Sequence, residues 1–191
     1  MKKNTLITIA SILGVLIVLF LLAVGQYNKA VSMDEAVKSQ WAQVENQLQR
    51  RYDLIPNLVE TVKGFAAQEK TVFLGVAEAR KAYFQASQGA SVAEKAKAAG
   101  QVEGALSRLL LLQEKYPELK SNENFLKLQD SLEGTENRIA VERMRYNESV
   151  KQLNTYTRRF FGRMFAAWAG VEKAEYFEVP EAAKAAPQVK F

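Results

Sequence analysis

The feature that most constrains this chain is an apolar run near its N-terminus. From Leu6 to Gly25 there is no charged residue and no proline, and Lys2 and Lys3 precede the run. At roughly 1.5 Å per residue, about twenty residues form a helix long enough to cross the roughly 30 Å hydrocarbon core of a bilayer. Because backbone groups in hydrocarbon must bond within their own segment, a lone run of this length crosses only as a helix. We therefore expect a short cytoplasmic N-terminus over residues 1–5 and a transmembrane helix over residues 6–25.

The large apolar side chains of this run are expected to face lipid and to act as the membrane anchor. They are Leu6, Ile7, Ile9, Ile12, Leu13, Val15, Leu16, Ile17, Val18, Leu19, Phe20, Leu21 and Leu22.

The charges that flank the run predict its orientation. Lys2, Lys3 and the amino terminus precede it, whereas Lys29 alone follows closely. Positive flanks stay in the cytoplasm, so the rest of the chain is expected on the periplasmic or extracytoplasmic side of a bacterial inner membrane, in single-pass topology. A cleaved signal peptide is the alternative, because small residues at 23–25 offer a cleavage site. The apolar core exceeds the usual 7–15 residues of a signal peptide, which favours a retained anchor.

Composition excludes several classes of site. The chain has no cysteine and no histidine, which removes thiolate chemistry, the commonest general base and the commonest metal ligand. Without Lys2 and Lys3, 24 basic residues face 21 acidic ones. This balance is too mild for a nucleic-acid footprint, which needs clustered Lys and Arg. We expect no cofactor, no nucleic-acid partner and no enzymatic activity.

Helical spacing of apolar residues dominates the rest of the chain. Breaks are expected at Pro56, at Ser87–Gly89 and at Pro117, and Ser91 with Glu94 has the pattern of a capping box. The fourth helix is expected to begin between residues 121 and 124 and to continue past residue 156. The expected fold is all-α: the transmembrane helix, then an antiparallel up-and-down bundle of about four long helices over residues 26–172, then an extended tail over residues 173–191.

Several stretches of the chain resemble the LemA family. They are WAQVENQLQRRYDLIPNLV at 41–59, ETVKG at 60–64, residues 129–147 with Asn137, Arg138 and Ile139, YFE at 176–178, and APQVKF at 186–191. The resemblance implies a membrane-anchored helical bundle with no established enzymatic activity. Genes of family members often lie beside those of membrane metalloproteases, which implies a partner-binding role. The chain departs from the family at Gln68, where a histidine is frequent.

A polar cluster surrounds the predicted break at Pro56. Its members are Gln47, Arg50, Arg51, Asp53 and Asn57. One interpretation is a partner-binding surface at the end of the first helix. The structural alternative, which needs no partner and is preferred, is that Asp53 caps a helix, Asn57 bonds loop backbone, and the arginines pair with Glu136 or Glu142.

A segment of basic and aromatic residues follows the fourth predicted helix. It contains Arg158, Arg159, Phe160, Phe161, Arg163, Met164, Phe165 and Trp168. In an up-and-down bundle, the fourth helix returns to the end where the first one leaves the membrane. Cations and aromatic rings suit the membrane interface, so this segment is a candidate for lipid contact. The alternative is that the aromatic side chains cap the open end of the bundle.

These observations predict a membrane-anchored, non-enzymatic scaffold or adaptor for envelope proteins, with membrane lipid as a partner of the N-terminal helix. A lipid-interacting membrane-organising protein is the first alternative. A hydrolase that uses Glu142 with Thr135 or Tyr146 is the least supported, because no nucleophile, base and orienting group have a recognisable spacing. Thr135 and Glu142 better fit polar positions that set helix register.

Overall fold

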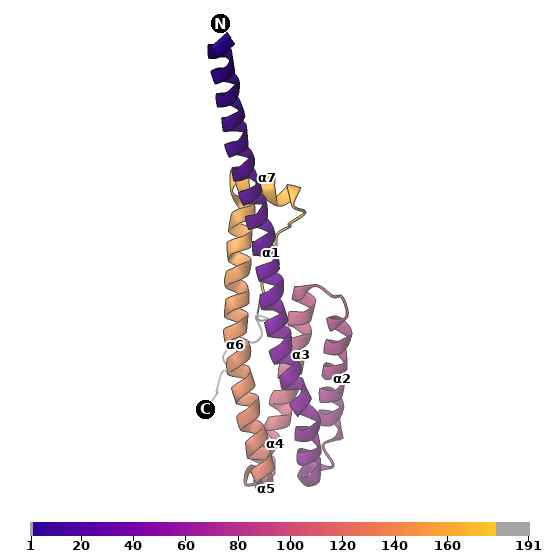
Figure 1. Cartoon of the computed structure of the whole chain (residues 1–191). Helices are drawn as coiled ribbons and strands as arrows, with labels where there is room; N and C mark the ends of the chain where they lie inside the picture. Colours follow the sequence, from indigo (N-terminus) through magenta and orange to yellow (C-terminus); the bar gives the residue numbers. More distant parts are fainter. Residues whose placement is uncertain (1, 179–191) are drawn as a thin grey trace, which may run out of the picture. The chain divides into compact units, whose positions relative to one another are not determined.

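Helices make up most of the described chain. The computed structural model describes the backbone of residues 2–178 and the side chains of residues 6–178. The helices in this part are α1 (Lys2–Ala66), α2 (Lys70–Ser87), α3 (Val92–Leu110), α4 (Leu112–Lys115), α5 (Pro117–Lys120), α6 (Glu123–Arg158) and α7 (Phe160–Trp168), with no strand between residues 2 and 178 (Figure 1). The all-α prediction is therefore confirmed.

The chain divides into two units. Unit 1 contains the chain up to Gln40 and the segment Glu148–Ala174, and unit 2 contains Trp41–Asn147 and the residues from Glu175 onward. The helices α1 and α6 each contribute one part to both units. Residues 26–172, predicted as a single bundle, thus contribute to both units.

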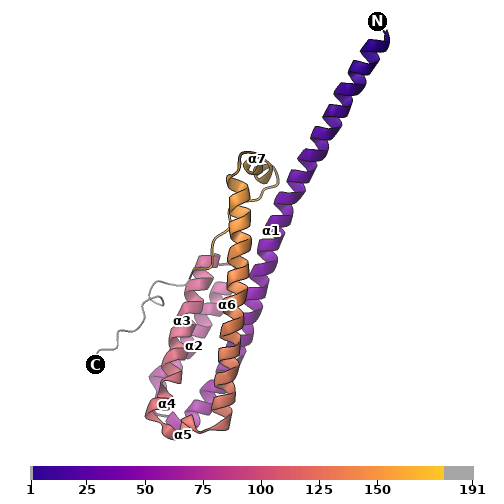
Figure 2. The same cartoon turned by 90° about the vertical axis from the view of Figure 1, so that its left-hand side faces the viewer.

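Unit 2 is a bundle of four long helical segments, joined in part by the short α4 and α5, and Figures 1 and 2 show α2 and α3 running side by side within it. Its core is an apolar stripe on each segment at helical spacing. The stripe of α1 includes Val44, Leu48 and Ile55, all at most 2% exposed, as the sequence pattern predicts. On α6, Phe125 and Ile139 are also buried. These stripes give each helix one dry face against its neighbours.

A capping box starts α3, as predicted. The Glu94 backbone N–H donates to Ser91 Oγ at 3.2 Å, and the Ser91 backbone N–H donates to Glu94 Oε2 at 2.9 Å. Both bonds satisfy N–H groups that a helix start otherwise leaves free. Glycine follows the end of α2 with φ +110° at Gly89, a conformation that other residues rarely adopt.

The predicted break at Pro56 is wrong, because α1 continues through it to Ala66. Proline removes one helical hydrogen bond at a cost of roughly 3 kcal/mol. Tyr52, Ile55 and Leu58 flank the proline and are at most 2% exposed, so their packing offsets the lost hydrogen bond and the helix continues through this position. The turn lies instead at residues 67–69, where Glu69 accepts from Lys115 Nζ at 2.6 Å and from the Tyr116 hydroxyl at 2.8 Å.

The third predicted helix is divided in the structure. It consists of α3 and the short α4, and α5 follows before α6 begins. At the start of α6, Asn122 Oδ1 accepts from the Phe125 backbone N–H at 3.0 Å, which is the expected capping geometry. The helix ends at Arg158, past residue 156 as predicted, and α7 is a separate helix.

Unit 1 contains the N-terminal part of α1, the last turns of α6, and α7 (Figure 2). In α1 the apolar side chains from Leu6 to Leu22 are 51–72% exposed. This is the helix that is long and apolar enough to cross a membrane, with a mean hydropathy of 3.0 in its most apolar stretch.

A turn at residues 169–170 follows α7, the chain from there to residue 178 forms neither helix nor strand, and two asparagines of α6 hold it. In unit 1, the Asn154 side chain donates to Ala174 O at 2.9 Å and accepts from Ala174 N at 3.0 Å. In unit 2, Asn147 makes the same pair of bonds with Phe177, at 3.1 and 2.9 Å. Hydrogen bonds from two asparagine side chains to its backbone therefore hold the first part of the predicted tail, residues 173–178. Residues 179–191 lie outside the described residues.

Replacing Ser91 with alanine is expected to lower the free energy of unfolding by about 1 kcal/mol, because the capping acceptor is lost. The measurement is urea unfolding of the full-length protein in detergent, followed by circular dichroism. Ser131→Ala is the matched control, because Ser131 Oγ only bonds back to Lys127 O within α6. Equal losses in the two variants would contradict the capping role.

Candidate functional site

The first candidate site is the α7 corner, which we define as residues 156–168 together with Gln26 and Tyr27 of α1. The Tyr156 hydroxyl donates to Gln26 O at 2.9 Å, and the Trp168 ring packs edge-on against Tyr27 at 5.4 Å between centroids. The end of α6 therefore lies beside the point where the apolar part of α1 ends, as counting the helices predicted.

Gly162 makes the sharp turn from α6 into α7 possible. A Cβ atom at this position would lie 2.1 Å from the backbone oxygen of Tyr156. No side chain fits in that space, because backbone atoms cannot move aside as the end of a flexible side chain can. The close approach seats the first turn of α7 on the last turn of α6.

The two faces of α7 differ in their surroundings. On the inner face, Gly162, Phe165 and Ala166 are buried within unit 1. Phe160 is 84% exposed and Trp168 is 67% exposed, and Phe161 and Met164 share this outer face. Phe165 packs against the rest of unit 1, as the structural alternative predicts, while the others form an apolar surface that no described residue covers. Lipid contact of that surface stays a prediction.

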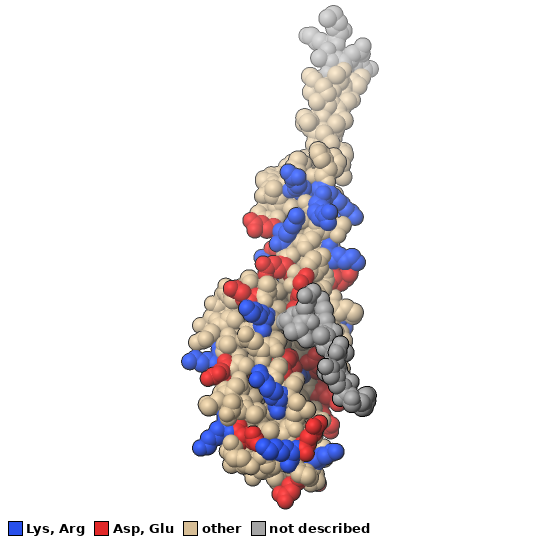
Figure 3. Space-filling model, turned by 180° about the vertical axis from the view of Figure 1, so that it is seen from behind, with Lys and Arg blue, Asp and Glu red and all other residues tan. Residues whose placement is uncertain are grey.

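Basic side chains surround this apolar surface. Lys29, Arg158, Arg159 and Arg163 are exposed, and none forms an ion pair with a carboxylate of residues 6–178. Figure 3 shows basic side chains gathered on one face just beyond the apolar end of α1. The α7 corner therefore combines exposed aromatic rings with unneutralised positive charge.

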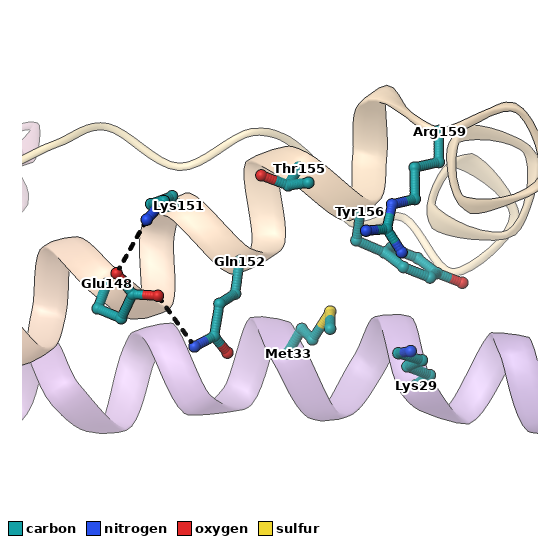
Figure 4. Close-up of a pocket in the computed structure, with 8 residues that line it drawn as sticks. All are labelled: Lys29, Met33, Glu148, Lys151, Gln152, Thr155, Tyr156 and Arg159. Atoms are coloured by element: carbon teal, nitrogen blue, oxygen red, sulfur yellow. Dashed lines mark hydrogen bonds and ion pairs between the residues drawn. The ribbon is translucent and has the colours of Figure 1, made fainter.

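A small groove of about 190 Å³ lies between α1 and α6 in unit 1, at the α7 corner. It is lined by Lys29, Met33, Glu148, Lys151, Gln152, Thr155, Tyr156 and Arg159. In Figure 4 the Arg159 guanidinium points toward the Tyr156 ring, and Lys29 reaches the same end of the groove from α1. The Lys29 ammonium lies 5.9 Å from the Tyr156 ring centroid. Burial raises the pKa of the Tyr156 phenol, which stays protonated and donates to Gln26.

The second candidate site, the predicted partner surface, is divided by burial. Arg51 is only 7% exposed and turns into the core of unit 2. Its guanidinium donates to Glu103 Oε2 at 2.6 Å and to Leu132 O at 2.7 Å, and it lies 3.1 Å from Glu136 Oε2. Pairing with Glu136 confirms the structural alternative for this arginine, and it removes Arg51 from any surface.

The other members of that cluster lie on α1 at different depths. Gln47 is half-buried, whereas Arg50, Asp53 and Asn57 are exposed on one helix face. Asp53 accepts from Gln49 Nε2 at 2.8 Å within the helix, so the predicted N-cap role is wrong. Asn57 also lies inside α1 and has no loop backbone to bond, since the loop was expected from a break that does not occur. A partner-binding role of the exposed residues stays a prediction.

The three residues considered for a hydrolase each bond a different partner and do not bond one another. Glu142 pairs with Arg145 at 2.8 Å, Thr135 donates to Leu132 O at 2.8 Å, and the Tyr146 hydroxyl donates to Glu175 O at 2.7 Å. Each bond holds a helix turn or the tail. Thr135 also faces Arg51 Nη1 at 3.5 Å, consistent with a polar position that sets helix register.

Sequence reasoning missed Glu103 and the groove residues. A signal for Glu103 was present, because it lies in the apolar stripe of α3 beside Val102 and one turn from Leu106. A carboxylate in such a stripe needs a buried cationic partner. For Lys29 and Arg159 no local pattern existed, since 130 positions of chain separate them.

Replacing Arg51 with methionine is expected to lower the free energy of unfolding by about 2–3 kcal/mol near neutral pH, because Glu103 loses its partner. The loss should stay below that of a fully buried pair, since the Glu103 side chain is 37% exposed. Burial raises the pKa of the Glu103 carboxyl, and Arg51 opposes that rise. Without Arg51 the pKa in the folded state rises further, so the folded state gains a proton as the pH falls. The variant should therefore lose less stability at about pH 5 than at about pH 8.

Glu136→Gln is the matched control for this experiment. The Glu136 side chain is 50% exposed, so its loss should cost at most about 1 kcal/mol. Chemical unfolding of both variants at the two pH values measures the difference. An Arg51→Met loss that does not change with pH would contradict the role of Glu103.

Comparison with known proteins places the chain in a family. Magnetosome proteins MamQ 1 and MamQ 2 of Paramagnetospirillum magneticum (strain AMB-1) are each 27% identical over 176 residues, covering 80% of this chain and 65% of each relative. Magnetosome protein MamQ of Magnetospirillum gryphiswaldense is 26% identical over 175 residues, covering 80% of this chain and 64% of the relative. The chain thus spans less than two thirds of the length of these relatives. The LemA family matches residues 40–191, which is most of the sequence, and the chain belongs to the LemA family.

Proposed function

We propose that this protein is a membrane-anchored, non-enzymatic scaffold that presents its helices to protein partners in a bacterial envelope. The observation that carries the proposal is α1, in which one helix bears both an uncharged, mostly apolar exposed stretch and core residues of unit 2. Moving each exposed Leu, Ile, Val or Phe from water into hydrocarbon is favourable by roughly 1.5–3 kcal/mol. Residues 6–25 therefore act as a single-pass anchor of the protein.

The proposed location is the inner membrane, with both units on the periplasmic side. Lys2 and Lys3 precede the apolar stretch, and the next basic residue after it is Lys29. This excess of positive charge at the N-terminus supports the orientation.

A scaffold role is supported by how the polar groups of unit 2 are distributed. Arg51 and Thr135, which are buried, bond within the bundle. The exposed face of α1 with Arg50, Asp53 and Asn57 leaves charged and amide groups available to a polar protein surface. The names of the relatives place them with the magnetosome and state no reaction, which is compatible with a structural role.

The test is site-specific photocrosslinking of the full-length protein in intact cells. A photoreactive residue at Asn57 is expected to give a discrete protein adduct, because this face is proposed to meet a partner. The matched control is Lys81, which is exposed on α2 of the same unit. Carbonate extraction in parallel should leave the protein in the membrane fraction. Identical adducts at both positions, or none beyond lipid, would overturn the scaffold proposal.

A lipid-associated role is a second candidate because of one observation. The outer face of α7 exposes Phe160, Phe161, Met164 and Trp168, and Trp168 packs on Tyr27 just after the apolar stretch of α1. An aromatic face at this level suits the membrane interface, with arginines toward the head groups. In this role α7 rests in the interface beside the anchor.

Depth-dependent quenching tests this second candidate. The chain has two tryptophans, so Trp41→Phe leaves Trp168 as the reporter. In vesicles, lipids with a quencher high on the acyl chain should quench Trp168 more strongly than aqueous iodide does. Phe160→Ser with Phe161→Ser should shift the balance toward iodide; Phe165 is left unchanged because it is buried. Preferential quenching by iodide in the parent protein would rule out interfacial contact.

A further inference from the structure

We propose that the groove lined by Lys29 and Arg159 binds the phosphate group of an anionic phospholipid. This inference rests on the proposed membrane anchorage, and it adds a specific lipid site to it. The groove lies wholly within unit 1, between α1 and the end of α6.

The groove lies close to the end of the apolar part of α1, at the level of the lipid head groups. Lys29 follows Gly25, the end of the apolar run, by four residues of unbroken helix. This spacing places the Lys29 backbone about 6 Å beyond the hydrocarbon core along the helix axis. The head-group layer of each leaflet extends about 5–7 Å beyond that core. The groove therefore opens at the level where lipid phosphates lie, with Lys29 at this level and Met33 one turn farther from the hydrocarbon.

The two ends of the groove differ in charge. At the end of the groove nearest α7, Lys29 and Arg159 converge on Tyr156, and neither is paired with a carboxylate of residues 6–178 (Figure 4). At the other end, Glu148 is already engaged, with Lys151 Nζ at 3.5 Å and Gln152 Nε2 at 3.3 Å. One end of the groove is thus cationic and the other is neutralised. A single anionic group fits the cationic end.

The volume of the groove and the side chains that line it suit a phosphate group. The volume of about 190 Å³ is below the roughly 300–1,000 Å³ of pockets that enclose a whole small molecule. It suits a compact group whose remainder stays outside, as a lipid phosphate stays joined to its acyl chains. Arginine presents a planar fork of donors to phosphate, and lysine supplies a point charge. The hydroxyl of Thr155, in the same lining, is a further donor for a phosphate oxygen.

Unneutralised arginines beside the groove extend the same surface. Arg158 and Arg163 are exposed on either side of the start of α7. Juxtamembrane cations attract anionic lipid with a strength that corresponds to roughly fivefold in affinity per residue. These arginines raise the local concentration of anionic lipid, and the groove selects one phosphate from it.

The experiment measures lipid retention by the full-length protein in detergent with native mass spectrometry. The probes are phosphatidylglycerol and phosphatidylcholine, added separately. The groove variant combines Lys29→Gln with Arg159→Gln. The matched control combines Lys81→Gln with Lys120→Gln, which removes the same charge from exposed positions in unit 2. Circular dichroism verifies that all variants keep their helices.

We expect the parent protein to retain phosphatidylglycerol in preference to phosphatidylcholine. The groove variant should bind it at least fivefold more weakly, by roughly the effect of one to two cations, while the control should change little. Glu148→Gln should act in the opposite direction, because it removes the carboxylate that faces the groove. Equal retention of the two lipids, or equal losses in the groove variant and the control, would overturn the inference.

Two further arms separate the possible outcomes. Glycerol phosphate in excess should not displace phosphatidylglycerol; displacement at concentrations similar to those of the lipid would assign the groove to soluble phosphate esters and overturn the lipid assignment. Carbonate extraction of cells that express the groove variant should leave it in the membrane fraction. Loss of the parent protein itself from the membrane fraction would refute the anchorage, whereas loss of lipid selectivity alone would refute only the groove.

Discussion

The continuity of α1 is the constraint on which the other features depend. Over residues 6–25 its side chains are uncharged and, apart from Thr8 and Ser11, apolar, and farther along only one stripe is buried. The first pattern requires an apolar surrounding, and the second requires other helices on one side and water on the other. Because one helix meets both requirements, the packing partners of α1 begin directly where its apolar stretch ends. Gln26 and Tyr27 meet such partners, the hydroxyl of Tyr156 and the ring of Trp168.

Much of the helical architecture could be predicted because it is encoded locally. The stripe through Val44, Leu48 and Ile55, the capping box at Ser91 and the start of α6 near residue 123 each follow from spacings of a few residues. Pro56 misled the prediction because a local rule met a tertiary one: the missing hydrogen bond costs less than the packing of Tyr52, Ile55 and Leu58 contributes. Helix propensity alone contains no information about that packing.

The candidate sites were harder to predict than the fold, and for a different reason. Whether Arg51 lies outside or inside depends on Glu103 and Glu136, which are far away in sequence and come together only through helix packing. The family resemblance marks the segment around Arg51 but does not say whether it binds a partner or stabilises the core. Its burial assigns the arginine to the core. A strong sequence motif can therefore mark a structural ion pair, and the partner surface that we propose rests on less distinctive residues such as Arg50 and Asn57.

The basic residues of the α7 corner show how a folded surface can differ from the signal that sets topology. Positive charges influence insertion when they lie within about 15–20 residues of the transmembrane segment. Arg158, Arg159 and Arg163 follow the apolar stretch by more than 130 positions, so they do not oppose the orientation that Lys2 and Lys3 favour. Folding then brings Arg159 to the same groove as Lys29. In the proposed orientation, these residues form a cationic surface beside the anchor without acting as topology signals. A positively charged corner is therefore compatible with the extracytoplasmic location that we propose.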